Sequence, residues 1–217
     1  MSITLPNGTK TSIASAYAAA ETVSAITNAN PAVASSTGHG LNNGDVIEIN
    51  SGWSALDGRI VRVANVTANT FELEGIDTTN VNNYPSGSGA GSVRAITAWT
   101  QLTQIMGRQA SGGEPSFYTF KFEEDPSNTE RQIRTGKSAK AITINLGNDP
   151  SKPWNSVLVA ADQDGENRAV RHVFPNNAIQ YLNANVAYDD VASMTSDEAM
   201  QNTLTLSLQS APTRYNS

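Results

Sequence analysis

The sequence has 217 residues, no cysteine, two histidines and a net charge of −6. The missing cysteines exclude disulfides, zinc–thiolate sites and cysteine nucleophiles, and two histidines are too few for a histidine-rich metal site. A protein that grips nucleic acid normally carries a basic stripe, so the negative balance disfavours tight binding of phosphate. Hydrophobic residues make up 38% and charged residues 16% of the chain, which leaves much of the surface to neutral polar side chains.

The amino-terminal stretch, residues 1–20, combines a turn at residues 6–8 with a run of small side chains at residues 14–20. This composition predicts a mobile arm or a segment exchanged between copies. No apolar run follows basic residues, so a secretory signal is not expected. No stretch approaches the roughly 20 apolar residues of a membrane-spanning helix. Thr22–Ile26 is predicted to form a strand.

The segment Ser35–Gly75 alternates short apolar runs with turns. Ile47 and Ile49 alternate with polar neighbours, and the same period of two recurs around residues 60–63 and 71–74. A period of two places one set of side chains on a buried face and the other toward water. The segment is therefore predicted to be a compact meander of antiparallel strands, a module that holds shape or presents a surface.

The next segment, Gly75–Gly91, is rich in Asn, Ser and Gly and is predicted to be a linker that closes the inserted module. Val93–Met106 fits two patterns. Trp99, Leu102 and Ile105 lie at helical spacing, whereas the threonine and β-branched content favours a strand. The strand is preferred, with Gly107 as its end.

Residues 108–140 predict a long hairpin. Its first arm places Tyr118, Phe120 and Phe122 on one face, and residues 126–129 form a polar tip. An acidic foot is expected to face a basic returning arm, and complementary charge between neighbouring subunits sets orientation and register. The candidate subunit-interface residues are Glu123, Glu124, Asp125, Arg131, Arg134, Lys137 and Lys140.

The clearest helix is predicted over residues 151–163. Asp149 or Ser151 can cap it, Pro153 suits its first turn, and Gly165 can close it. The apolar stripe with helical spacing consists of Trp154, Val157, Leu158 and Ala161.

The remaining segments predict strands around this helix. Ala141–Leu146 alternates apolar and polar residues, Ala169–Phe174 and Ile179–Val186 form a hairpin, and Met200–Leu208 buries one face. The chain is thus mainly β with a helix packed on the sheets.

Candidate catalytic and metal-binding residues are few. His39, between two glycines, is more readily explained as a turn residue than as a member of a catalytic triad. The stretch 162–166 begins like a calcium loop but lacks the third ligand and the later glutamate. The carboxylate pairs Asp189-Asp190 and Asp197-Glu198 are expected in solvated loops rather than in a hydrolytic site.

Several blocks occur in a familiar order. They are STGHGLNNGDVIEINSGW, ALDGRIVRVANVTANTFELEGIDTT, SVRAITAWTQLTQI, GGEPSFYTFKFEED, DPSKPWNSVLVAA, FPNN and NTLTLSLQSAPTRY. Over nearly its whole length the chain resembles the tail tube (major tail) proteins of long-tailed, non-contractile bacteriophages. The block at residues 37–75 also resembles a small β-barrel module named after a domain of ubiquitin-activating enzymes. Without a cysteine, no ubiquitin chemistry follows from that second resemblance.

The resemblance implies a mainly β fold of two packed antiparallel sheets, a sandwich or half-barrel, with one flanking α-helix. Residues 1–24 and 93–217 would form this tail-tube domain, including the hairpin at 108–140 and the helix at 151–163. Residues 25–92 would form a small inserted β-barrel-like domain that faces outward.

The resemblance also implies a structural subunit without catalysis, cofactor or metal. Copies would form homo-hexameric rings that stack into a hollow tube, and viral DNA would pass through the lumen without specific binding. Further partners would be the tail-tip or baseplate, tape measure and tail terminator proteins, with no membrane involved. The expected location is the virion tail, after assembly in the host cytoplasm. The alternatives are another tail component, such as a tail terminator or a receptor- or carbohydrate-binding module, and a cell-wall hydrolase.

Overall fold

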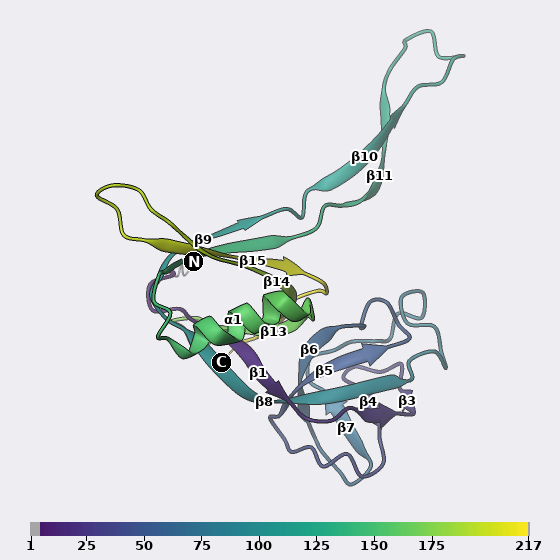
Figure 1. Cartoon of the computed structure of the whole chain (residues 1–217). Helices are drawn as coiled ribbons and strands as arrows, with labels where there is room; N and C mark the ends of the chain where they lie inside the picture. The colour runs from purple at the N-terminus through teal and green to yellow at the C-terminus, as the bar shows by residue number, and fades with distance from the viewer. Residues whose placement is uncertain (1–4, 217) are drawn as a thin grey trace.

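The computed structural model describes residues 5–216, so the first four residues of the predicted 1–24 segment lie outside it. The described chain is mainly β, with a curled antiparallel sheet, a flanking helix and a projecting hairpin (Figure 1). The predicted fold class is confirmed. The strands of the main body are β1 (Lys10–Tyr17), β8 (Gly91–Leu102), β9 (Ile105–Ser111), β12 (Ala141–Gly147), β13 (Arg168–Val173), β14 (Ile179–Ser193), β15 (Gln201–Leu208) and β16 (Thr213–Tyr215).

The inserted module is a meander, as its sequence alternation predicts. Its strands are β3 (Ala25–Ile26), β4 (Ala32–Ser35), β5 (Val46–Ser51), β6 (Arg59–Ala64) and β7 (Thr70–Leu73), and β2 (Glu21–Val23) directly precedes it. The strand order is β8-β5-β6-β7-β4-β3, and β2 pairs with β8. Because β2 and β3 follow each other in the chain, the first and last strands of this curled sheet lie near each other. Trp53, Leu56 and Phe71 are fully buried inside it.

The period of two predicts that the residues alternating with Ile47 and Ile49 on β5 face water, but one of them does not. Glu48 is buried and accepts a hydrogen bond from Arg94 at 2.7 Å and another from Asn183 at 3.1 Å. A buried carboxylate needs such partners because an unpaired one is costly to desolvate. Glu48 therefore joins the module to β14 of the main body.

The predicted amino-terminal arm is wrong. Its residues 10–17 form β1, which pairs with β8 on one side and with β13 on the other. Ile13 and Ala14 are fully buried, and Thr11 donates to or accepts from Nδ1 of buried His172 at 2.8 Å. Pairing with two neighbouring strands holds this segment in place, although the small residues after Ala14 are exposed.

The segment Val93–Met106, which fits both a helix and a strand pattern, is extended, and the predicted strand is confirmed. β8 pairs with β1 and with the module strand β5, so a single long strand serves both parts of the molecule. The prediction that Gly107 ends the strand is wrong. A break at Thr103 and Gln104 separates β8 from β9, and β9 continues through Gly107 to pair with β12.

The helix α1 (Pro153–Asp164) packs its predicted stripe on the sheet, with Trp154, Leu158 and Ala161 buried. Pro153 opens the helix and Gly165 closes it in the left-handed conformation, both as predicted. The predicted caps are wrong: the N-cap position is Lys152 and has no side-chain cap. Asp149 instead accepts hydrogen bonds from the backbone and hydroxyl of Ser151.

Candidate assembly surfaces

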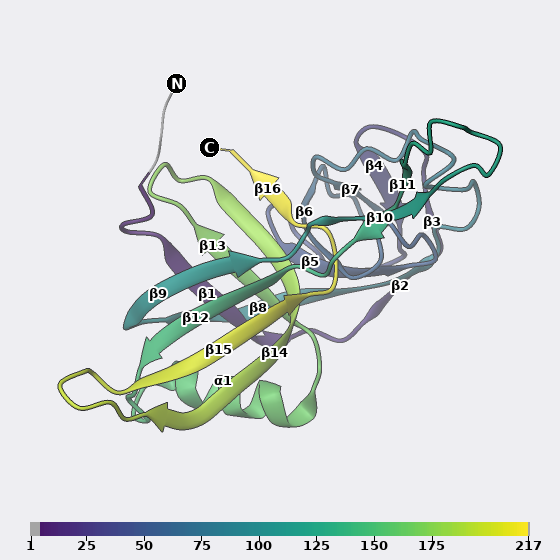
Figure 2. The ribbon, with the colours of Figure 1, turned by 90° about the horizontal axis from the view of Figure 1, so that it is seen from above.

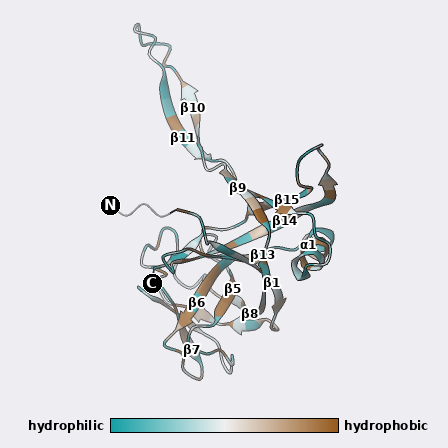
Figure 3. Ribbon diagram, turned by 90° about the vertical axis from the view of Figure 1, so that its left-hand side faces the viewer, coloured by the Kyte–Doolittle hydropathy of each residue, from teal (hydrophilic) through white to brown (hydrophobic). Residues whose placement is uncertain are grey.

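The hairpin predicted at residues 108–140 is present and stands away from the rest of the molecule (Figures 1 and 3). Its strands are β10 (Pro115–Phe120) and β11 (Arg131–Lys137), which pair with each other in a separate two-stranded sheet. Nearly every residue of the two strands is exposed. Isolated two-stranded hairpins are marginal in water, so this one lacks the packing that usually holds such a pair.

One side of the hairpin, the aromatic face, is built as the sequence predicts. The rings of Tyr118 and Phe120 stack at 6.3 Å, and Phe120 meets Phe122 edge-on at 5.3 Å. Ile133 lies opposite Tyr118 and extends the apolar strip. Tyr118 is 62% exposed and Ile133 57%, so this strip is open to a partner.

The other side of the hairpin, the basic face, depends on an irregular register. A bulge lies between the pairs Ser116–Gly136 and Phe117–Arg134. Because residues that oppose each other share a face, the bulge brings Arg134 and Lys137 to the same side as Phe117. Phe117 is 51% exposed.

The charged interface candidates are distributed unevenly along the hairpin. Glu123, Glu124 and Asp125 lie near its tip rather than at its foot. Asp125 accepts hydrogen bonds from the hydroxyl and backbone N–H of Ser127, which lower the pKa of its carboxyl group. It also lies 3.8 Å from Arg131, whose guanidinium covers the Phe122 ring.

The rest of the basic arm has no acidic partner in the described chain. Among residues 5–216, no ion pair within 4.0 Å involves Arg134, Lys137 or Lys140. The structure therefore brings together one predicted acid–base pair and leaves three cations free. Whether these residues form a subunit interface stays a prediction.

A second projection connects β14 to β15, at the opposite side of the molecule from the hairpin (Figure 2). Asp197-Glu198 lies in this loop and is exposed, as predicted. The prediction of a loop is wrong for Asp189-Asp190, which is exposed but belongs to the end of β14. The apolar side chains of the projection are exposed as well: Val191 is 70% and Met194 76% accessible. Burial raises the pKa of Tyr188 at its base, and the nearby charges of Asp190 and Asp189 raise it further.

Over β9, β12, β15 and the adjoining part of β14, the sheet has one face covered by α1 and one face open, and Figure 2 looks onto the open one. Farther along, Ile60 and Tyr215 cover that face at Tyr181. Thr143 on β12 pairs with Thr205 on β15 and with Gln109 on β9, so these side chains point the same way. The same register places uncharged residues along β9, β12, β15 and β14. This neutral face consists of Gln109, Thr143, Asn145, Asn185, Ala187, Thr203, Thr205 and Ser207.

The apolar residues of these strands point the other way, toward α1. Ile144, Leu204 and Leu206 are fully buried there with Trp154 and Leu158. Sequence reasoning found the alternation within β15 but could not find the neutral face, because that face exists only once four distant strands are in register.

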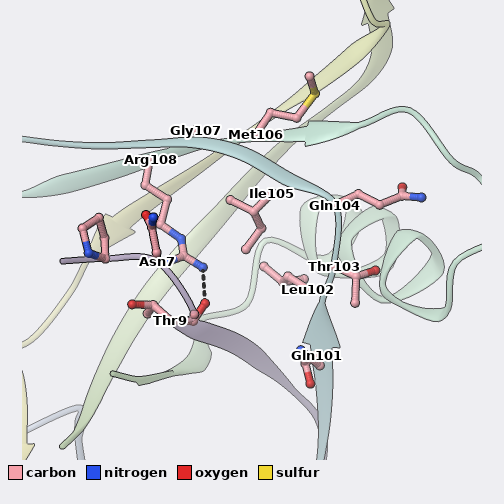
Figure 4. Close-up of a pocket in the computed structure, with 12 residues that line it drawn as sticks. Asn7, Thr9, Gln101, Leu102, Thr103, Gln104, Ile105, Met106, Gly107 and Arg108 are labelled. Carbon is pink, nitrogen blue, oxygen red and sulfur yellow. Dashed lines mark hydrogen bonds between the residues drawn. The ribbon is translucent and has the colours of Figure 1, made fainter. Parts of the chain in front are cut away.

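A hollow between the start of β1 and the β8–β9 turn offers little chemistry (Figure 4). Arg108 reaches into it and donates a hydrogen bond to the backbone carbonyl of Thr9 at 3.2 Å. Burial lowers the pKa of this guanidinium. The lining holds neither a carboxylate nor a histidine, so it provides no acid–base pair.

The other chemical candidates have structural surroundings. His39 is buried in the inserted module, where its Nδ1 accepts a hydrogen bond from the backbone of Leu41 and its ring meets Phe71 edge-on at 5.1 Å. In the calcium-loop-like stretch 162–166, Asp162 accepts a hydrogen bond from the backbone of Tyr188, and Asp164 pairs with Arg168. Within the described chain no group of three potential metal ligands gathers. Likewise, no helix in residues 5–216 is long and apolar enough to cross a membrane.

A family model described as "Phage tail tube protein, TTP" matches residues 51–217. The chain belongs to the phage tail tube protein family. It is therefore a structural subunit of a phage tail tube, as its sequence predicted. No curated protein matches the sequence.

Several solved structures are similar in part. The tail of an empty GTA particle, refined with C6 symmetry, has 9% identity and a TM-score of 0.43, covering 54% of this chain and 86% of that one. The anti-feeding prophage baseplate has 12% identity and a TM-score of 0.39, covering 56% and 86%. The anti-feeding prophage cap has 19% identity and a TM-score of 0.34, covering 50% and 79%. Similarity at this level is too weak to assign a role to any residue of this chain.

Proposed function

We propose that copies of this subunit form hexameric rings that stack into a hollow tube, with the neutral face toward the bore. The observation that carries this proposal is that strands β9, β12 and β15 present only uncharged residues on the open side of the sheet. Arg171 and Lys10 lie on the same side but farther along the sheet, on β13 and β1. Asp189, opposite Thr203 at the far end of β14, is acidic and would repel phosphate.

A DNA conduit has to avoid holding DNA. Each phosphate that a lysine or arginine neutralises releases counterions and adds affinity, and a ring multiplies every contact by its number of subunits. Arg108 would be the nearest cation on β9, but its register with Ile144 turns it to the opposite side of the sheet. A neutral wall of this kind leaves passing DNA mobile.

Ring formation would also protect a free sheet edge. β9 pairs with β12 on one side and forms the end of the sheet, with Gln109, Ala110 and Ser111 exposed. An exposed strand edge is a template for pairing with another chain, and a closed ring uses that edge up. We assign the stacking of rings to the hairpin and to its seven charged candidate residues.

The division into a tail-tube domain (residues 1–24 and 93–217) and an inserted module (residues 25–92) is part of the proposal. Two of the apolar clusters support it, one inside the curl around Trp53 and Phe71 and one between α1 and the sheet. A third cluster, in which Ile60 packs with Tyr181, joins the two parts. The module, which we place on the outside of the tube, keeps its predicted likeness to the module named after ubiquitin-activating enzymes. The assignment to non-contractile, long-tailed phages is likewise proposed.

In this role the chain acts without catalysis, cofactor or metal. Its partners are other copies of itself, the tail-tip or baseplate proteins, the tape measure protein and the tail terminator. It assembles in the host cytoplasm and ends in the virion tail, with DNA passing through the lumen without specific binding.

Tubes grown from purified protein test the bore assignment. Thr205→Lys adds one cation per subunit to the neutral face, whereas Ser156→Lys adds one to the exposed side of α1. Grown in the presence of short duplex DNA, Thr205→Lys tubes should protect at least about tenfold more DNA from nuclease than wild-type tubes, because counterion release now favours binding inside. Ser156→Lys tubes should bind DNA that stays nuclease-sensitive. Equal protection by both variants, or a protein that forms no rings or tubes in any condition, contradicts the proposal.

A further inference from the structure

The two projections of the molecule point away from each other. In Figures 1 and 2 the hairpin and the β14–β15 connection leave opposite sides of the sheet. Within one copy they cannot meet. In a head-to-tail association different patches of two identical subunits touch, and these two projections provide a pair of such patches.

The basic face of the hairpin combines one exposed ring with two free cations. Phe117 is half-exposed, and the bulge places Arg134 and Lys137 on its side of the strands. Neither cation has a carboxylate within 4.0 Å in the described chain. On the aromatic face, by contrast, Arg131 is already engaged with Asp125 and Phe122.

The end of β14 and the connection that follows it, residues 189–200, have the complementary chemistry. This segment carries Asp189, Asp190, Asp197 and Glu198 and contains neither lysine nor arginine. Val191 and Met194 are its most exposed apolar side chains. Methionine adapts readily to the shape of a partner, which suits a contact formed during assembly.

We propose that the basic face of the hairpin docks on the β14–β15 connection of a second copy, with Phe117 against Met194 and with Arg134 and Lys137 against Asp197 and Glu198. This inference rests on the proposed tube assembly, in which it names the surface that receives the hairpin. The apolar pair excludes water and holds the contact. The charges set its register and speed the encounter between copies.

A charge exchange tests the pairing. Arg134→Glu with Lys137→Glu should slow tube growth, followed by light scattering, by about tenfold or more, because like charges now oppose each other. Asp197→Lys with Glu198→Lys should do the same. Combining all four changes restores the net charge and the pairing, so growth should return to within about threefold of wild type. Glu21→Lys with Glu72→Lys, on β2 and β7, is the matched control and should grow like wild type.

Cross-linking gives an answer that does not depend on rates. Since the chain has no cysteine, introduced thiols act on a clean background. Thr119→Cys, on the basic face, combined with Met194→Cys should yield disulfide-linked ladders from tubes under mild oxidation. Ile133→Cys, on the aromatic face, combined with Met194→Cys should not.

The outcomes separate this inference from the proposed function. If wild-type protein forms no tubes, the tube assembly itself fails. If wild type forms tubes and both reversals slow growth, but the combined variant stays slow and no Thr119–Met194 ladder forms, the hairpin docks elsewhere and the inference is overturned. Unchanged growth of the Asp197 and Glu198 variant overturns it too.

Discussion

The inserted module and the hairpin are both built from short antiparallel strands with alternating apolar residues, yet they are stabilised in different ways. In the module, Phe71 and Leu73 on β7 have no exposed surface. In the hairpin, Phe117 and Tyr118 on β10 are more than half exposed. The same pattern produces a core in one place and an uncovered surface in the other, because only the module curls its sheet around its own side chains.

This difference shows where the missing packing must come from. Burying a large apolar side chain contributes about 1.5–3 kcal/mol, and the hairpin gains little of that within one subunit. Its rings become buried only when another copy covers them. We therefore expect changes in the module to alter folding and changes in the hairpin to alter assembly.

Removing the hairpin should have the largest effect on assembly. Replacing residues 115–137 by Gly-Gly deletes both exposed faces but leaves the β9–β12 pairing in place. Tube growth should be abolished, while the free energy of unfolding should change by less than about 1 kcal/mol, as for surface changes away from the core. Electron microscopy and urea unfolding measure the two quantities. Tubes of normal length from this variant would show that the hairpin is not needed for assembly.

A matched pair of phenylalanine substitutions compares the module and the hairpin at single residues. Phe71→Ala should lower the free energy of unfolding by about 3–5 kcal/mol, because it leaves a cavity in the module core. Phe117→Ala should lower it by less than about 0.5 kcal/mol but slow tube growth. Urea unfolding and light scattering on the same samples give both numbers. Similar destabilisation by the two changes would mean that the hairpin packs within its own subunit.

Acid tests the folded core without involving the hairpin. Burial, with a smaller effect from the Arg108 charge, lowers the pKa of His172 from 6.5 to about 4. Because the unfolded state binds the proton first, the stability from neutral His172 is complete above pH 6.5 and is lost as the pH falls toward 4. The loss should amount to about 3 kcal/mol.

Urea unfolding at several pH values measures this loss, and His172→Gln should flatten the curve between pH 6.5 and 4. An equally steep curve for that variant would assign the acid sensitivity to carboxylates. Hairpin deletion should leave the slope unchanged, because His172 contacts Thr11 on β1.

Local patterns predicted most of the elements. The alternation at Ile47 and Ile49, the helix opened by Pro153 and the aromatic strip from Tyr118 to Phe122 are all found where the sequence places them. These features depend on neighbours in sequence, so a single chain segment carries the signal.

What the sequence could not supply depends on distant contacts. The run of small residues from Ala14 favours mobility, since nothing local shows that the strand containing it pairs with β8 and, before Ala14, with β13. The alternation in β5 predicts that Glu48 faces solvent, because its partners Arg94 and Asn183 are distant in the sequence. The bulge that unites Arg134 and Lys137 on one face, and the register that assembles the neutral face, likewise arise from pairing between separate strands.

Cryo-electron microscopy of tubes grown from the wild-type protein tests the account most directly, since it shows which side of the sheet surrounds the bore. We expect Thr143 and Thr205 to face the bore, α1 to lie outside it, and each hairpin to contact the next ring. A bore lined by α1 or by lysine and arginine side chains, or subunits that cannot close a circle, would contradict it.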